Sequence, residues 1–210
     1  MIRVLVADDH TVVRRGVKQI LSEAPDIVVV GEASTAHEAI RAVRQERFDV
    51  LVLDIAMPEG GGLEVLSQLW GLETRPHVLI LSMYPEKQYA LRALKSGASG
   101  YLTKESASEE LVAAVRTIAR GGRYVTQALA ETMADELGNT PGQAPHDRLS
   151  DRECQVMCLV AGGKTVTEVA TELSLSAKTV STYRARILTK LGVSNNAEIV
   201  RYAFQHGLVD

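Results

Sequence analysis

In the N-terminal half, polar residues that could do chemistry directly follow apolar, strand-like runs. The runs end in Asp8 and Asp9, in Asp54, in Ser82 and, after a shorter run, in Lys104. Because the carboxyl ends of parallel strands meet at one edge of an open α/β sheet, we expect these side chains to converge on one crevice. Taken alone, Asp54 could equally be the N-cap of a following helix, and only the other polar residues at the strand ends favour a site.

Carboxylates gathered at one point repel one another, which favours either a raised pKa or a bound hard cation. Mg²⁺ prefers oxygen ligands and typically uses one or two carboxylates together with a phosphate. The ammonium of Lys104 and the hydroxyl of Ser82 could stabilise charge on a phosphoryl group, for which Asp54 would be the nucleophile. The residues therefore predict Mg²⁺-assisted transfer of a phosphoryl group to Asp54.

Length and composition bound the kind of protein. The chain has 210 residues and a net charge of −3, which is long enough for two small domains. No run approaches the roughly 18 apolar residues of a membrane-spanning helix. Cys154 and Cys158 have no metal-site partners, which indicates small buried thiols and not metal or redox chemistry. We expect a cytoplasmic protein with no membrane partner.

Strand-like and helical patterns alternate through the first 120 residues. Strands are expected at 2–7, 27–30, 50–53, 78–81 and 100–103, and helices at 11–21, 36–46, 63–70, 86–96 and 111–118. This alternation predicts an α/β fold with a doubly wound, five-stranded parallel sheet and helices on both faces.

A set of residues in this half has the types and the order of a known family. The set comprises Asp8, Asp9, Asp54, Met57, Pro58, Gly62, Ser82 and the run 97–104. It closely resembles the receiver domain, a flavodoxin-like fold, of bacterial two-component response regulators. The resemblance extends over about residues 2–120.

The resemblance implies a role for each polar residue. Asp54 accepts a phosphoryl group from a cognate sensor histidine kinase. Asp9 and Asp54 hold Mg²⁺, together with Asp8 through water and with the backbone carbonyl of Ala56. Lys104 contacts the phosphoryl group.

The resemblance also implies a switch, in which Ser82 moves toward the phosphate and lets Tyr101 swing inward. Without it, Tyr101 is simply a half-buried aromatic residue of a strand. A Mg²⁺-dependent phosphatase would also use Asp54 as its nucleophile. Such enzymes commonly need an acidic residue two positions later, where this chain has Ala56.

The middle of the chain has the composition of a linker. Residues 126–137 could form one short amphipathic helix, and residues 138–145 have the Gly and Pro content of a flexible tether. We therefore expect a receiver domain at 1–120, a linker at 121–147 and a second domain at 148–210.

The last segment is helical by pattern. Capping boxes at Ser150–Glu153 and Thr165–Glu168 open two short helices. After a three-residue turn, a longer helix is expected at 177–191, followed by a final helix at about 196–206. Two helices joined by a tight turn predict an all-α helix-turn-helix domain.

The helix at 177–191 carries four cations and no acidic residue. Val180, Ile187 and Leu191 make its expected buried stripe. The remaining basic and small residues suit close approach to the major groove of DNA. The predicted DNA-contacting residues are Lys178, Thr179, Ser181, Thr182, Arg184, Ala185, Arg186 and Lys190. A bundle that binds only a protein partner remains the alternative, and its binding would show no steep salt dependence.

Several short motifs of this segment resemble the LuxR-type helix-turn-helix of NarL/FixJ response regulators, over residues 148–209. They are the runs 149–153, 161–163, 168–170, 175–176, 178–180 and 190–193. In that family the helix after the turn reads the major groove and the final helix pairs two copies. The pairing residues would be Asn196, Ile199, Val200 and Ala203. The implied partners are promoter DNA, a second copy of the phosphorylated chain and RNA polymerase.

Overall fold

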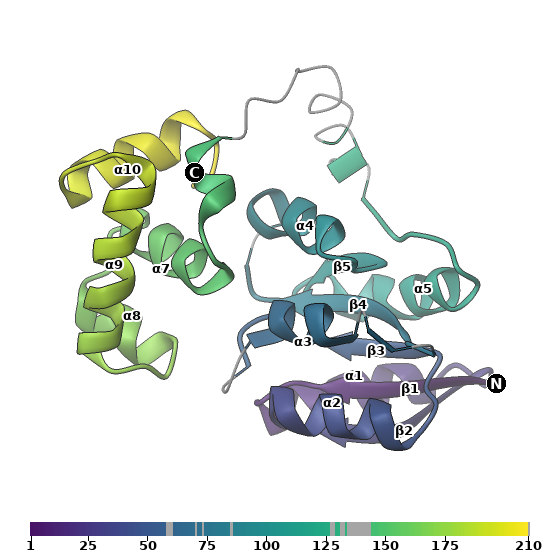
Figure 1. The fold of residues 1–210 in the computed structure, drawn as a ribbon. Coiled ribbons are helices and arrows are strands. Elements are labelled where there is room, and N and C mark those ends of the chain that lie inside the picture. Colours follow the sequence, from purple (N-terminus) through teal and green to yellow (C-terminus); the bar gives the residue numbers. More distant parts are fainter. Residues whose placement is uncertain are drawn as a thin grey trace. The chain divides into compact units, whose positions relative to one another are not determined.

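The computed structural model shows the fold of two compact units, Met1–Glu131 and Thr132–Asp210 (Figure 1). It describes residues 1–57, 61–69, 71–72, 74–84, 86–126, 129–130, 133 and 144–209. The short helix expected within 126–137 and the tether expected at 138–145 lie mostly outside the described residues. The domain boundaries at 120 and 148 stay predictions.

The first unit contains a five-stranded parallel sheet with the strand order β2-β1-β3-β4-β5 (Figure 1). The strands are β1 Ile2–Ala7, β2 Ile27–Ala33, β3 Val50–Leu53, β4 His77–Ser82 and β5 Gly100–Thr103. The order reverses at β1, which pairs with β2 on one side and with β3 on the other. This confirms the predicted doubly wound sheet, whose switch point is where such folds bind ligands.

Helices alternate with these strands as the sequence predicts. They are α1 Thr11–Ser22, α2 Ala36–Gln45, α3 Gly61–Leu69, α4 Glu86–Lys95 and α5 Ala107–Ala119. Alternate residues of the strands, such as Val4, Val6 and Val52, point to one face of the sheet. There they pack with α1 and α5 in one buried cluster. The strands are therefore apolar on the face that these two helices cover.

The second unit is helical and begins with a 3₁₀ turn. Its elements are η1 Pro145–Arg148, α7 Asp151–Ala161, α8 Val166–Glu172, α9 Ala177–Leu191 and α10 Asn196–Gln205. Both predicted capping boxes are present, at Ser150–Glu153 and at Thr165–Glu168. α9 ends at Gly192, whose left-handed backbone (φ 69°) is the usual C-terminal stop. The helix-turn-helix arrangement of α8 and α9 is confirmed.

β2 and α5 extend furthest beyond the ranges that the sequence indicates. β2 reaches Ala33 instead of ending at 30, because an extra residue is accommodated where the register with β1 shifts. α5 begins at Ala107 instead of 111, because its first turn is polar and shows no apolar period. The acidic residues of that turn, Glu109 and Glu110, are favourable near the positive end of a helix.

Two compositional expectations can be compared with the structure. Within the described part of the chain, no helix is both long enough and apolar enough to cross a membrane. Cys154 and Cys158 are both buried, as expected.

Candidate functional site

The expected carboxylates come together at the switch point of the sheet. Asp8 and Asp9 follow β1, Asp54 follows β3, and these two strands are direct neighbours. One ligand atom from each of them, and one from His10, all lie within 4.8 Å of one another. Asp8 and Asp54 are buried, with 2% of each residue exposed. The carboxyl ends of β1 and β3 therefore hold buried negative charge.

Lys104 enters this cluster from the end of β5. Its Nζ lies 2.6 Å from Oδ2 of Asp8 and 3.0 Å from Oδ2 of Asp54. Its backbone N–H donates to the carbonyl of Ser82 at 2.7 Å, which fixes the start of the loop after β5. One ammonium group therefore contacts two of the three carboxylates, and negative charge remains in excess.

The pKa values of the two central groups reflect this crowding. Burial raises the pKa of Asp54; the Lys104 ammonium opposes this effect and the Asp8 carboxylate adds to it. Burial alone would lower the pKa of Lys104, but attraction to Asp54 and Asp8 outweighs it, so the pKa is raised. Lys104 is therefore held in its charged form, while a cation near Asp54 would favour the carboxylate.

The loop after β3 is shaped around Asp54. The Ala56 N–H donates to Oδ1 of Asp54 at 3.1 Å, and the Gly62 N–H donates to the Ile55 carbonyl at 2.9 Å. A Cβ atom at Gly62 would lie 2.4 Å from the carbonyl oxygen of Asp54, so only glycine fits without a shift. Pro58, which belongs to the same motif, lies outside the described residues.

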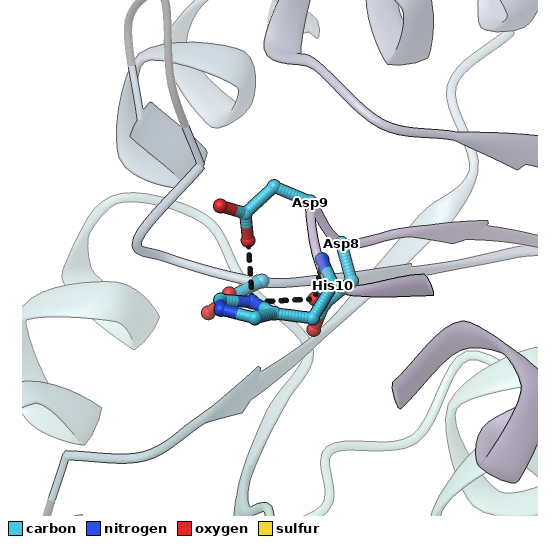
Figure 2. Close-up of side chains that lie close together, drawn as sticks. Asp8, Asp9 and His10 are labelled. Carbon is cyan, nitrogen blue, oxygen red and sulfur yellow. Dashed lines mark hydrogen bonds and ion pairs between the residues drawn. The ribbon is translucent and has the colours of Figure 1, made fainter. Parts of the chain in front are cut away.

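His10 is a site residue that the sequence reasoning missed. Its Nδ1 lies 2.7 Å from Oδ1 of Asp9 and 3.3 Å from Oδ1 of Asp8, and Figure 2 shows the ring turned toward both carboxylates. Its backbone N–H also donates to Oδ1 of Asp8 at 2.8 Å. The available signal was its place directly after the acidic pair.

The donor set fits a hard divalent cation. Asp8, Asp9 and Asp54 offer carboxylate oxygens, and the carbonyl of Ala56 lies two residues past Asp54 in the same loop. These are the ligand types that Mg²⁺ prefers. The acidic cluster is typical of Mg²⁺-binding receiver domains, and the imidazole of His10 adds a nitrogen donor to it.

Ser82 and Tyr101 are linked through a third residue, Tyr84. The Tyr84 N–H donates to Oγ of Ser82 at 3.1 Å, and the Tyr101 hydroxyl donates to the Tyr84 carbonyl at 2.8 Å. Ser82 and Tyr101 are both fully buried. In this structure the Tyr101 ring lies inward and is fully buried, not half-buried. Nothing in the sequence indicates that Tyr84 connects it to Ser82.

In the second unit, α9 has one buried and one exposed side. Val180, Ile187 and Leu191 are buried, which confirms the predicted stripe. Most of the predicted DNA-contacting residues are exposed. The exposed members are Lys178, Ser181, Thr182, Ala185, Arg186 and Lys190, while Thr179 and Arg184 are partly buried. The exposed side of α9 is therefore mostly polar and basic, and several of its side chains are short.

Two of the α9 cations already have partners within the unit. The Arg184 Nε donates to Oδ1 of Asn196. The Lys190 Nζ lies 2.6 Å from Oε2 of Glu153, whose side chain is only 3% exposed. Glu153 also closes the capping box of α7. Lys190 therefore has a structural role that the sequence did not indicate.

The four residues expected to pair two copies lie differently on α10. Ile199 and Ala203 are fully buried within the chain, whereas Val200 is 38% exposed and Asn196 is also exposed. Phe204, which was not expected, is 68% exposed. The pairing role stays a prediction, and the large apolar side chains exposed for it on α10 are Val200 and Phe204.

Comparison with known families accounts for both units. Residues 4–116 match the family described as response regulator receiver domain, and residues 147–203 match the family described as bacterial regulatory proteins, luxR family. Response regulator UvrY of Escherichia coli (strain K12) is 36% identical over 209 residues, which are 99% of this chain and 96% of the relative. Response regulator GacA of Pseudomonas protegens is 36% identical over 210 residues, which are 100% of this chain and 99% of the relative.

Solved structures give the same result. RcsB from Salmonella enterica serovar Typhimurium, bound to promoter rprA in the presence of the phosphomimetic BeF₃⁻, matches with a TM-score of 0.64 and 26% identity. The match covers 96% of this chain and 97% of that chain. Both units and their order along the chain are therefore shared with known proteins.

Proposed function

This chain belongs to the NarL/FixJ family of two-component response regulators, which bind DNA to regulate transcription and are not enzymes in the usual sense, and from that premise we propose that phosphate on Asp54 controls its binding to promoter DNA. The observation that carries the proposal is the placement of Asp54, buried beside Asp8 and within 3.0 Å of the Lys104 ammonium. This is the geometry that a phosphoacceptor carboxylate needs.

The phosphoryl group would come from a phosphohistidine of a cognate sensor kinase. A carboxylate oxygen of Asp54 attacks phosphorus, and the bond from phosphorus to the histidine nitrogen breaks as the acyl phosphate forms. Lys104 contacts the transferred group and offsets its charge. Asp9 and Asp54, with Asp8 through water and the Ala56 carbonyl, would hold Mg²⁺, which supplies further neutralisation of the phosphoryl oxygens.

The added charge would act through the hydrogen bonds that join Ser82, the Tyr84 backbone and Tyr101. Ser82 moves toward the phosphate, which releases its bond with the Tyr84 N–H. Because the Tyr84 carbonyl accepts from Tyr101, the same movement acts on the Tyr101 ring. The face formed by β4, α4 and β5 is thereby biased between two arrangements.

The output would be DNA binding by a pair of chains. The exposed residues of α9 enter the major groove, and α10 joins two copies so that two half-sites are read together. A coupling free energy of about 3 kcal/mol between phosphate and DNA would raise affinity roughly a hundredfold. RNA polymerase is then the expected next partner, and the cytoplasm the expected compartment.

A phosphodonor experiment tests the first step. Wild type, Asp54→Asn and the control Asp26→Asn are incubated with acetyl phosphate, with and without Mg²⁺, and their intact masses are measured. Asp26 is a suitable control because it pairs with Arg116 and lies outside the acidic cluster. We expect one added phosphoryl group in wild type and in Asp26→Asn, only with Mg²⁺, and none in Asp54→Asn. Addition to Asp54→Asn would remove Asp54 from its role.

A further inference from the structure

The Arg14 side chain binds the backbone of the turn that contains Asp8 and Asp9. Its Nη1 donates to the carbonyl of Asp8 at 2.7 Å, its Nη2 donates to Oγ1 of Thr11 at 3.3 Å, and its Nε donates to Oε2 of Glu32 at 3.3 Å. The side chain is only 14% exposed. One guanidinium group therefore ties together the end of β1, the start of α1 and the strand β2.

A bulge in β2 places Glu32 where it can hold Arg14. Val4 pairs with Val29, but Leu5 pairs with Gly31, so β2 has one extra residue at that point. Paired residues of parallel strands share a face, and Glu32 pairs with Val6, which belongs to the face covered by α1. Without the extra residue, Glu32 would point to the opposite face. The bulge therefore turns the Glu32 carboxylate toward the face of the sheet that α1 covers.

Glu32 is itself held in place and charged. Nζ of Lys18 lies 2.9 Å from Oε1 of Glu32, and the other oxygen accepts from Arg14. The hydrogen bond from Lys18 lowers the pKa of Glu32 against the effect of burial, and the bond from Arg14 adds to this. The Glu32 carboxylate therefore stays ionised near neutral pH and orients the guanidinium toward Asp8.

We propose that Arg14, oriented by Glu32, is a positioning residue for the phosphorylation site. By fixing the Asp8 carbonyl, it sets the direction in which the Asp8 and Asp9 carboxylates face Asp54 and a bound Mg²⁺. The same turn is fixed from the other side by the bond from the His10 N–H to Asp8. This inference rests on the proposed function, since it assigns Arg14 to the same cation site.

The test measures Mg²⁺ binding to the unphosphorylated full-length protein by titration calorimetry. Outer-shell partners of metal ligands typically contribute about 10-fold or more to affinity, so Arg14→Ala should weaken the Kd for Mg²⁺ by about 10-fold. Arg14→Lys should fall between Arg14→Ala and wild type, because an ammonium lacks the planar fork of donors. The matched control is Arg116→Ala, since Arg116 also binds a carboxylate, that of Asp26 just before β2. That variant should bind Mg²⁺ as wild type does.

Phosphorylation by acetyl phosphate gives a second readout. In Arg14→Ala the Mg²⁺ concentration for half-maximal rate should rise, while the rate at saturating Mg²⁺ should return to that of wild type. A merely structural role would instead lower the rate at every Mg²⁺ concentration. The His10 amide signal in NMR spectra should also shift in Arg14→Ala and stay unchanged in Arg116→Ala.

Each outcome decides between two ideas. An unchanged Kd in Arg14→Ala, or an equal loss in Arg116→Ala, overturns the role of Arg14 and leaves the proposed function standing. A wild-type protein that neither binds Mg²⁺ nor accepts phosphate overturns the proposed function itself. If Arg14→Ala does not fold, Arg14→Lys and Glu32→Gln decide, and wild-type Mg²⁺ affinity in both overturns the inference.

Discussion

Nζ of Lys104 lies 3.0 Å from Oδ2 of Asp54, although β4 separates the strands that precede them. The contact is possible because the loop after β5 is fixed by the bond from the Lys104 N–H to the Ser82 carbonyl at the end of β4. A negative charge added to Asp54 therefore acts directly on Lys104. Through the Lys104 backbone it also acts on the ends of β4 and β5.

Replacing Lys104 should slow phosphorylation. In Lys104→Met no ammonium offsets the charge that develops near Asp54, and removal of one such stabilising donor typically costs about 100-fold in rate. The measurement is the initial rate of acetyl phosphate incorporation at saturating Mg²⁺. Lys164→Met removes an exposed lysine of the second unit, where it pairs with Glu172, and should keep the wild-type rate. Equal rates in wild type and Lys104→Met would contradict this role.

Adding one methyl group at Gly62 should destabilise the first unit. The new Cβ would meet the carbonyl oxygen of Asp54 at 2.4 Å, and overpacking of this kind costs about 1–3 kcal/mol of unfolding free energy. Urea denaturation measures the change. The control is Gly16→Ala within α1, where nothing lies within 4 Å of the new Cβ. Because Ala is the better helix former, that variant should be more stable by up to about 1 kcal/mol.

The pair of Glu153 and Lys190 should make the second unit sensitive to acid. Burial raises the pKa of Glu153, but the bonds from Lys190 and from the Ser150 N–H outweigh it, so the pKa lies below its ordinary value of 4.5. A carboxylate with a depressed folded-state pKa stabilises the fold above its unfolded pKa, and this contribution is lost as the pH falls through the folded value. The protection factors of the α7 amides against hydrogen exchange, which are corrected for the intrinsic pH dependence of exchange, should therefore fall below about pH 4.5. In Glu153→Gln that dependence should be weaker, and an unchanged dependence would exclude Glu153 as its cause.

Cations of α9 should divide into two groups by their effect on DNA binding. Lys178→Ala and Arg186→Ala remove exposed charges and should each reduce the slope of log affinity against log salt by about one. Lys190→Ala should chiefly destabilise α7, because it leaves the Glu153 carboxylate buried without its cation. Binding that does not depend on salt in wild type would favour a protein partner for this face.

Polar residues at strand ends are easy to predict because a buried strand cannot contain them. Asp54 and Lys104 are visible as the first charges after apolar runs, and the parallel topology then requires them to meet. Arg14 and Glu32 gave no such signal. The period-two pattern of a strand assigns each residue to a face, and the bulge in β2 reverses that assignment for Glu32.

The two sides of an amphipathic helix are harder to assign than the helix itself. The pattern of α10 is clear, but apolar residues on it serve either the core or a partner. The structure buries Ile199 and Ala203 and leaves Phe204 exposed, and only the packing of α10 on α7 decides this. The partner of Lys190 was equally hidden, because Glu153 is 37 residues away along the chain.

Control of DNA recognition by phosphate on Asp54 is tested most directly by selecting bound DNA from a random-sequence pool. The selection is run with wild type and with Asp54→Asn, each before and after treatment with acetyl phosphate and Mg²⁺, and affinities for the enriched DNA are then measured. We predict that treated wild type enriches a sequence with two half-sites and binds it far more tightly than untreated wild type, while treatment leaves Asp54→Asn unchanged. The same DNA bound with the same affinity by wild type in both states would contradict the account.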